Sequence, residues 1–406
     1  MKRTFFLIVT SLLVASSLLT ACATPTSPGS TATTNLEATL QAYVEATLTA
    51  QPTATPLPTA TNTPPPTLTP TPARVQYGPT NFPENINPLT GLAVSDPALL
   101  NRRPVMVKVS NFPREGRPHA GLSFADIVFD YYTGEGSNRF LAVFYGQDSV
   151  QAGPIRSGRL VDRWLVGMYK GILGMYYAYE PVYNAIINQL GGRVITGDHC
   201  DDKFKAICSD GPNTETSHFA NTSELSKYYS SKTSATNTKQ NLDGMTFDSE
   251  VPLFGADGHE VTMRYGKNNE GQWKYDEATG KYLRFIDSLD ANNQMSMIPL
   301  VDRVNGNQLA FTNVIIAFAQ IETLNTGDTM HEIRVAGAKG RALIFRDGQV
   351  YDGVWKGVYD TPITFYDKDG NVIPLKPGNT WIHFTGASSK VVEDPAGVWK
   401  VTNYTP

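Results

Sequence analysis

The residues best suited to chemistry lie in one short stretch, residues 153–159, which reads Gly-Pro-Ile-Arg-Ser-Gly-Arg. Arg156 and Arg159 stand on either side of Ser157, after a strand-like run and before a helix-like one. We expect Ser157 to cap that helix with its side-chain oxygen, which places both guanidinium groups beside free backbone N–H groups. A helix start of this kind attracts phosphate or carboxylate. The stretch therefore predicts an anion-binding site at Arg156, Ser157 and Arg159.

The alternative is that these arginines are neutralised inside the fold. Asp126, Asp130, Glu135 and Asp162 lie near them in the sequence, and each would serve as a structural partner. Charged side chains that are buried in proteins are usually paired. The sequence alone leaves both interpretations open.

An enzyme would need an acid and a base in addition to the arginines. The candidates for catalytic roles are Asp126, Glu135 and His218, with His119 as a further histidine. The chain lacks the short motifs of serine hydrolases, zinc proteases, P-loop proteins and dinucleotide-binding enzymes. We expect no cofactor, and the sequence leaves open whether the protein is an enzyme.

Two cysteines, Cys200 and Cys208, stand close together in the sequence. In an exported chain such a pair most simply forms a disulfide that closes a small loop. The alternatives are a metal site that adds the aspartate and histidine side chains of residues 198–202, and two free thiols. We expect the disulfide and no metal.

The elements that must position these residues follow two patterns. Between about residues 103 and 230, strand-like runs such as 103–111 and 125–133 alternate with helix-like segments such as 160–172. This alternation predicts an α/β layered domain over residues 80–240. Beyond it, strand-like runs and Asp-Gly turns predict a mainly antiparallel β domain over residues 245–406.

The N-terminal residues have a different composition from the rest. Residues 1–22 have a charged start, an apolar run and small residues before Cys22, which resembles the signal peptide of a bacterial lipoprotein. The resemblance implies lipid on Cys22, so that the exported protein is anchored to the outer face of the cell membrane. The alternative is ordinary cleavage that leaves Cys22 free. Residues 23–79 are rich in threonine and proline and predict a disordered stalk.

Nucleic acid is not an expected partner. The formal net charge is −4, and no basic block occurs in the chain. Proteins that bind nucleic acid usually concentrate Lys and Arg on one face or in one segment. The expected partners are the membrane, through Cys22, and an anionic ligand.

Six stretches carry a family resemblance: Asn-Pro-Leu-Thr-Gly-Leu (87–92), residues 117–144, Gly-Pro-Ile-Arg-Ser-Gly-Arg (153–159), residues 217–225, residues 340–357 and Pro-Gly-Asn-Thr-Trp-Ile-His-Phe (377–384). They resemble the YerB-like family of bacterial lipoproteins, and the likeness covers most of residues 85–385. It implies a domain of unknown function followed by a β-rich C-terminal domain, and it supplies no settled activity. The chain departs from the family where Ser217, rather than proline, precedes His218, and in its loop between the two cysteines.

Together these observations predict a lipid-anchored envelope protein that binds an anionic cell-wall or lipid-linked glycan ligand through its two arginines. The alternative is a cell-wall hydrolase or glycan transferase that uses the three catalytic candidates named above as acid or base. A third hypothesis is a scaffold for other envelope proteins, with the helical apolar stripe of residues 36–48 as the contact surface.

Overall fold

The computed structural model describes residues 73–212, 215–325, 327 and 330–405. The predicted signal peptide, Cys22 and the predicted stalk up to residue 72 lie outside the described residues. Thr71–Pro406 forms one compact unit. Within its described part, no helix is long and apolar enough to cross a membrane.

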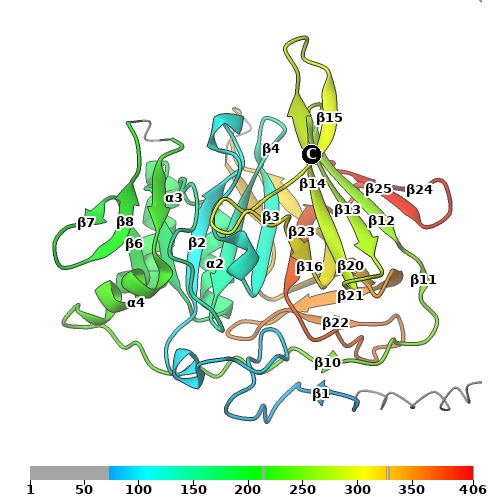
Figure 1. Cartoon of the computed structure of the whole chain (residues 1–406), viewed down its shortest axis with the longest axis horizontal. Helices are drawn as coiled ribbons and strands as arrows, with labels where there is room; N and C mark the ends of the chain where they lie inside the picture. The colour runs from blue at the N-terminus through cyan, green and yellow to red at the C-terminus, as the bar shows by residue number, and fades with distance from the viewer. Residues whose placement is uncertain (1–72, 213–214, 326, 328–329, 406) are drawn as a thin grey trace, which may run out of the picture. The chain divides into compact units, whose positions relative to one another are not determined.

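An eleven-stranded mixed sheet contains strands from both halves of the sequence (Figure 1). Strand β3 of the first half pairs in parallel with β23 of the second half, so that Asp130 lies beside His383. The two predicted domains are therefore joined by backbone hydrogen bonds, and their boundaries stay a prediction. In spatial order the strands are β11 (Ala256–Asp257), β21 (Gln349–Gly357), β20 (Ala338–Arg346), β17 (Asn313–Ala319), β23 (Thr380–Gly386), β3 (Ile127–Gly134), β4 (Ser137–Phe144), β2 (Val105–Ser110), β5 (Ile172–Met175) and β6 (Val194–Thr196), with β22 (Thr364–Tyr366) paired to β21.

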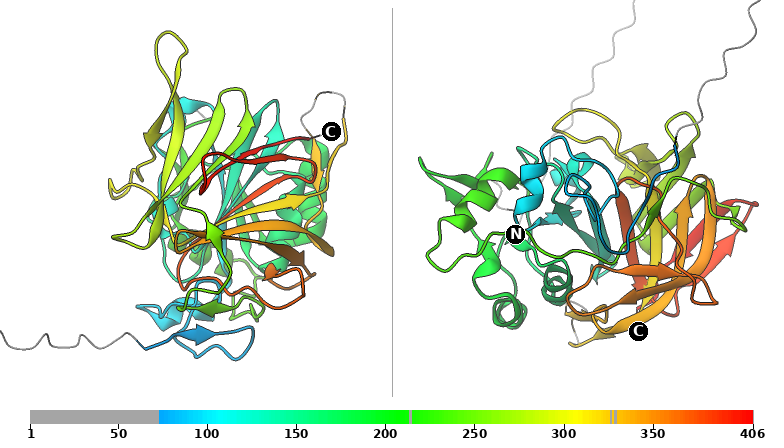
Figure 2. Two further views of the ribbon diagram at one scale, coloured as in Figure 1. Left: turned by 90° about the vertical axis from the view of Figure 1, so that its right-hand side faces the viewer. Right: turned by 90° about the horizontal axis from the view of Figure 1, so that it is seen from below.

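A seven-stranded sheet from the second half packs on one face of the larger sheet (Figure 2). Trp273 of β13 meets Trp381 of β23 with ring centroids 5.2 Å apart, inside a shared apolar core. The strands are β15 (Met295–Pro299), β14 (Lys281–Leu289), β13 (Asn269–Asp276), β12 (Glu260–Gly266), β25 (Val398–Thr402) and β24 (Lys390–Glu393), with β16 (Ala310–Phe311) paired to β14. Three small sheets comprise β7 (His199–Cys200), β8 (Lys205–Ser209) and β9 (His218–Ala220); β1 (Gln76–Tyr77) and β10 (Phe247–Asp248); and β18 (Ile321–Thr323) and β19 (His331–Ile333).

The helices cover the first-half strands of the large sheet on both faces. Successive side chains of a strand point to opposite faces, and on β2 Met106 joins the core under α2 and α3, whereas Val107 joins the core that includes Leu225 of α4. The α-helices are α2 (Leu160–Met168), α3 (Glu180–Leu190) and α4 (Thr222–Ser230). Short 3-10 helices span Pro97–Asn101, Arg114–Gly116, Leu122–Phe124 and Gly191–Arg193.

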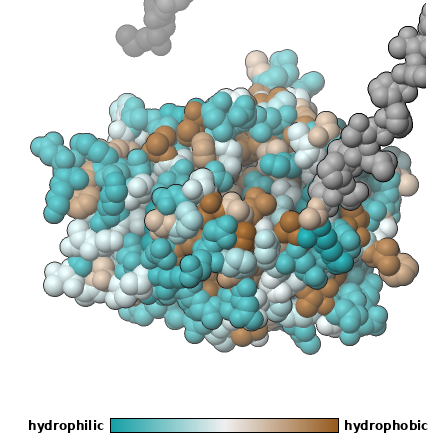
Figure 3. All heavy atoms as spheres, turned by 60° about the horizontal axis from the view of Figure 1, so that its bottom comes forward, coloured by the Kyte–Doolittle hydropathy of each residue, from teal (hydrophilic) through white to brown (hydrophobic). Residues whose placement is uncertain are grey.

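The structure is mostly β with several sheets, which agrees with the prediction for the second half. The strands predicted at 103–111 and 125–133 are β2 and β3, and the helix predicted at 160–172 is the shorter α2. The lower face of Figure 1, brought forward in Figure 3, is mainly hydrophilic with hydrophobic residues scattered over it. Scattered exposure of this kind is normal for a protein surface.

Candidate anion-binding site

The predicted Arg-Ser-Gly-Arg stretch lies between the ends of the parallel strands β2 and β5. The Arg156 N–H donates to the Lys108 carbonyl at 3.0 Å, and the Tyr176 N–H donates to the Arg156 carbonyl at 3.1 Å. A Cβ atom at Gly158 would lie 2.5 Å from the Met175 sulfur. The close approach of this segment to β5 therefore favours glycine at position 158, since a Cβ atom there would displace the Met175 side chain.

The prediction that Ser157 caps the following helix is wrong. Helix α2 begins at Leu160 with Arg159 at its N-cap, and the Asp162 carboxylate accepts the Arg159 N–H at 2.6 Å. The Ser157 carbonyl oxygen instead accepts the guanidinium groups of Arg139 at 2.7 Å and Arg159 at 3.3 Å. Ser157 therefore positions two arginines through its backbone and not through its hydroxyl.

Three arginines, Arg139, Arg156 and Arg159, line one pocket of about 280 Å³, which we call the arginine pocket. Arg139 lies near the start of β4, opposite Tyr131 of β3 in the hairpin register. Sequence spacing did not indicate this third arginine as a site residue, because only strand pairing brings it to the stretch that holds the other two. The other lining residues are Phe112, Pro113, Thr133, Gly134, Glu135, Ser137 and Asn138.

Neighbouring acids neutralise this positive charge only in part. Arg156 Nη1 lies 3.1 Å from Glu215 Oε1, on a side chain that is 52% exposed. In the described part of the chain, no ion pair joins Arg139 or Arg159 to a carboxylate, and their recorded side-chain hydrogen bonds go to backbone carbonyls. Among the described residues, the buried Nε atoms of Arg156 and Arg159 have no hydrogen-bond partner, while Glu135 is the acid in the lining of the pocket.

Burial makes the charged forms of these arginines costly. It lowers the pKa of Arg139 well below the ordinary value, and the positive charges of Arg159 and Arg156 lower that pKa further. Burial also lowers the pKa of Arg159, against the opposing effect of Asp162. An anion in the pocket would favour the charged forms of both.

A buried lysine lies directly behind the arginines. Lys108 Nζ of β2 is 3.3 Å from Asp162 Oδ1 of α2, and the Tyr131 hydroxyl also hydrogen-bonds to Asp162. Burial lowers the pKa of Lys108 to about 7 despite Asp162, and the charges of Arg139 and Arg159 add to this lowering. The Lys108–Asp162 pair therefore connects α2 to β2 of the large sheet next to the arginines.

Two of the three catalytic candidates do not share a site. Asp126 precedes β3 and Glu135 follows it, which separates them by roughly 30 Å along an extended strand. The Asp126 carboxylate accepts the backbone N–H groups of Tyr145 at 2.6 Å and Gly146 at 2.9 Å. Only Glu135 lines the arginine pocket.

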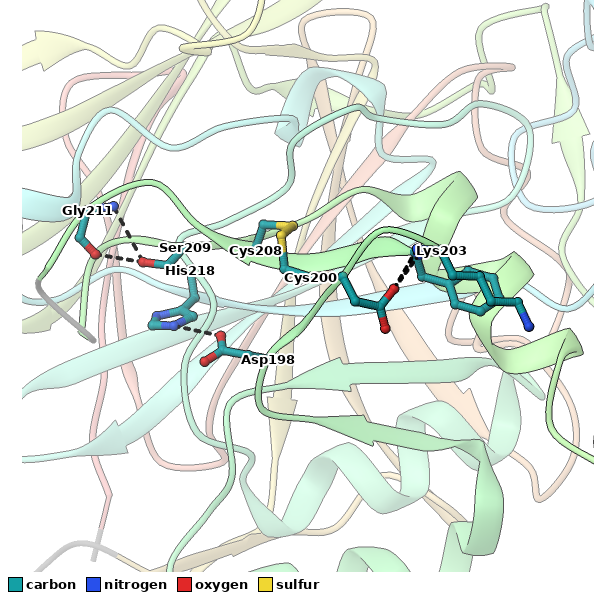
Figure 4. The surroundings of a disulfide bond; sticks show 9 residues. Asp198, Cys200, Lys203, Cys208, Ser209, Gly211 and His218 are labelled. Carbon is teal, nitrogen blue, oxygen red and sulfur yellow. Dashed lines mark hydrogen bonds and ion pairs between the residues drawn. A yellow bond between two sulfur atoms is a disulfide. The ribbon is translucent and has the colours of Figure 1, made fainter.

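The third candidate, His218, is next to the arginine stretch through its backbone. Its carbonyl oxygen accepts the Ile155 N–H at 2.7 Å. Its buried ring lies 2.9 Å from Asp198 through Nε2, as Figure 4 shows, and it packs on Tyr176 with ring centroids 4.5 Å apart. The imidazole is therefore directed to Asp198.

Cys200 of β7 and Cys208 of β8 form a disulfide (Figure 4). Strand β8 also pairs with β9, so the disulfide ties together the small sheet that carries His218. No group of three or more histidine, cysteine, aspartate or glutamate side chains suited to a metal ion occurs among residues 73–405 as far as these are described.

A buried polar cluster, the Asp130 centre, lies between the two large sheets and was not predicted. Asp130 of β3 is 3.1 Å from His383 Nδ1, 3.8 Å from Arg284 and 3.3 Å from the Trp381 indole nitrogen. The Asn138 side chain donates to Asp130 at 2.5 Å. The nearly continuous apolar run of β3 is typical of a strand covered on both faces, which would bury Asp130, but the partners of Asp130 come from distant strands.

Comparison with known proteins identifies the family of this chain. Family models described as the N-terminal and C-terminal domains of a protein of unknown function (DUF3048) match residues 89–236 and 261–382. The chain belongs to the YerB-like family. A Bacillus subtilis (strain 168) protein named "Putative lipoprotein YerB" is 27% identical over 301 residues, which cover 73% of this chain and 85% of that protein. The crystal structure of YerB protein from Bacillus subtilis matches with a TM-score of 0.62 and 26% identity, over 74% of this chain and 96% of that one.

These matches confirm the resemblance drawn from the sequence. Neither domain description names an activity, and the relative's name speaks only of a lipoprotein. The chemistry of this member must therefore be argued from its own pocket.

Proposed function

We propose that this protein is a lipid-anchored envelope protein outside the cytoplasm, whose arginine pocket binds an anionic group of a cell-wall or lipid-linked glycan ligand. The observation that carries the proposal is that Arg139, Arg156 and Arg159 line one pocket, while in the described part of the chain only Arg156 forms an ion pair with a carboxylate. Guanidinium groups suit phosphate and carboxylate because their planar N–H donors match two oxygens at once.

The position and size of the pocket support this ligand class. In this proposal the first half is an α/β layered domain, with the pocket beyond the ends of the parallel strands β2 and β5. Ligands of layered α/β sheets usually bind at the carboxyl ends of the strands. A volume of about 280 Å³ suits a phosphate or carboxylate with a small part of the molecule attached to it.

The lipid anchor is the second part of the proposal, and it rests on Cys22 and the relative's name. Lipid on Cys22 would hold the protein at the outer face of the cell membrane. We expect Cys22→Ser to move the protein from the membrane fraction to the soluble exported fraction. A variant that stays with membranes as the parent chain does would contradict the anchor.

The hydrolase or transferase alternative has less support. It needs an acid and a base that act on one bond, whereas Asp126 and Glu135 flank opposite ends of β3. His218 is turned toward Asp198. We therefore favour binding over catalysis for the arginine pocket.

Titration calorimetry with pyrophosphate and glucose 1-phosphate tests the binding proposal. We expect Arg139→Gln and Arg159→Gln each to weaken binding about tenfold or more, because each loses a charge-assisted hydrogen bond. Arg341→Gln is the matched control, since Arg341 pairs with Asp352 at 2.8 Å on the exposed face of β20. Failure of the parent protein to bind either probe, or equal losses in all three variants, would contradict the proposal.

A further inference from the structure

A second pocket lies at the other end of β3 and has no role in the proposed function. It has a volume of about 520 Å³ and is lined by Asp126, Lys281 and parts of residues 87–95, 146–147 and 377–379. It thus joins the Asn-Pro-Leu-Thr-Gly-Leu stretch of the first half to the Pro-Gly-Asn stretch of the second half. We call it the Asp126 pocket.

The carboxylate of Asp126 is the acid of this pocket, and it is buried without an ion-pair partner among the described residues. Its oxygens accept the Asn87 side-chain amide at 2.9 Å and the N–H groups of Tyr145 and Gly146. In the described part of the chain it has no ion pair, because Arg102, the nearby cation, pairs with Asp148 at 2.8 Å. A buried carboxylate with hydrogen bonds but no counter-charge favours a cationic ligand that can reach it.

The pKa of Asp126 agrees with this interpretation. Burial raises it to about 6, although the three donors and Arg102 act in the opposite direction. The ionised form is therefore costly in the ligand-free protein, and an ammonium group beside it would offset that cost. Gly146 keeps this approach open, because a Cβ atom there would lie 3.3 Å from the Asp126 carboxylate oxygen.

Lys281 gives the pocket the opposite charge. It opens β14, lines the pocket and has no ion pair among the residues that the structure describes. The rest of the lining is neither charged nor aromatic, and it mixes polar side chains such as Ser95, Gln147 and Asn379 with apolar ones such as Leu92 and Val94. A lining without aromatic rings offers no stacking surface for a sugar, but it offers hydrogen bonds to a small polar molecule.

We propose that the Asp126 pocket binds a small zwitterion, an amino acid or a dipeptide, with its ammonium group on Asp126 and its carboxylate on Lys281. One acid and one base in a single cavity match the two charges of such a molecule, and the cavity volume is sufficient for a dipeptide. This site is separate from the arginine pocket, and the inference does not depend on the proposed anion ligand.

Calorimetry with three related probes on the parent protein tests the inference. The probes are alanylalanine, its N-acetyl form and its C-terminal amide. We expect alanylalanine to bind, and each blocked form to bind about tenfold more weakly or worse, because each loses one charge-assisted contact. Equal binding of all three probes, or binding of none, would overturn the inference.

Two variants test which residue binds the amino group of the ligand and which binds its carboxylate. Asp126→Asn should remove the preference for a free amino group, and Lys281→Met should remove the preference for a free carboxylate. A change in preference, unlike a loss of affinity, does not follow from damage to the fold. If Asp126→Asn does not fold, Lys281→Met and the probe series still decide the question.

The control is Asp302→Asn. Asp302 is buried and accepts the N–H groups of Gly121 and Ser123 at 2.8 Å, much as Asp126 accepts its donors, but it does not line the pocket. We expect this variant to keep both preferences, and a loss of either would contradict the assignment. Arg159→Gln should leave alanylalanine binding unchanged, so failure of the anion proposal and failure of this one are distinguishable.

Discussion

The arginine pocket and the Asp130 centre both gather charged side chains, yet they use them differently. In the arginine pocket, three cations line a cavity, and in the described part of the chain only one pairs with a carboxylate. In the Asp130 centre, one fully buried carboxylate has a histidine, an amide, an indole and an arginine around it. Charge in excess at a cavity indicates a ligand, whereas charge matched by neighbours in a closed interior indicates a role in holding the sheets together.

The contrast is also one of position in the fold. The Asp130 centre lies where the first-half strand β3 pairs with the second-half strand β23, so it forms part of the contact between the two halves. The arginine pocket lies at the ends of β2 and β5. Its three arginines come from β4 and from residues 153–159, which both belong to the first half of the sequence. Damage to the centre should therefore affect the whole unit, and damage to the pocket should affect binding.

The largest effect is expected for Asp130→Ala. The change leaves His383 and Arg284 buried without their carboxylate, and breaking a buried ion pair costs about 3–5 kcal/mol. Urea unfolding should show this loss in the free energy of unfolding. Asp369→Ala, in an exposed turn, is the control and should change stability by less than about 0.5 kcal/mol. A loss below about 1 kcal/mol for Asp130→Ala would mean that the centre is not structural.

The two regions also differ in how far the sequence could predict them. The anion site was predicted in part, because Arg156 and Arg159 are close in sequence and a glycine and a proline mark the turn before them. Arg139 was missed as a site residue because strand pairing, not spacing, brings it there. The Ser157 cap was wrong because α2 begins only at Leu160, so that Arg159 is its N-cap, and Asp162, the third residue of the helix, accepts the Arg159 N–H.

Long-range pairing limited the prediction of the fold in the same way. Local periodicity located β2, β3 and α2 correctly, since apolar spacing is a property of each segment. The parallel pairing of β3 with β23 joins residues about 250 positions apart, and no local pattern encodes it. Asp126 and Glu135 were grouped as catalytic candidates although a strand predicted from local spacing already places them near its opposite ends.

A pH-dependent effect is expected for Lys108, which lies beside the arginines of the pocket. The pKa of Lys108 is about 7 in the folded protein, below its ordinary 10.5, so between these values the unfolded chain binds one more proton. The free energy of unfolding should therefore rise with pH in this window by up to about 1.4 kcal/mol per pH unit from this group. Urea unfolding from pH 7 to 10 should show this slope in the parent protein and lose it in Lys108→Met. Equal slopes in both proteins would show that Lys108 does not titrate there.

Removal of the disulfide tests whether the small sheet of β7, β8 and β9 can be destabilised without the large sheet. Cys200 and Cys208 are 8 residues apart, and opening so short a loop in the double serine variant should cost about 2.5 kcal/mol. The loss should be local, because the disulfide ties β7, β8 and β9 and not the large sheet. Hydrogen exchange should speed up in β8 and β9 and stay unchanged in β3 and β23. Faster exchange in β3 as well would show that the small sheet and the large sheet lose stability together.

The smallest effect on stability, and the sharpest for function, is expected for Glu215→Gln. Glu215 is half exposed and pairs with Arg156, and exposed pairs of this kind contribute about 0–1 kcal/mol. If the role of Arg156 is only to pair with Glu215, the variant should lose stability and gain no affinity for pyrophosphate. If the pocket binds anions, Glu215 competes with the ligand, and its removal should leave the melting temperature nearly unchanged while it tightens pyrophosphate binding several-fold.

The affinity of the Glu215→Gln variant for pyrophosphate should also become more sensitive to salt, because one more cation is then available to the ligand. Calorimetry at two salt concentrations, with Glu322→Gln as a control for an exposed glutamate paired to Arg334, distinguishes the two outcomes.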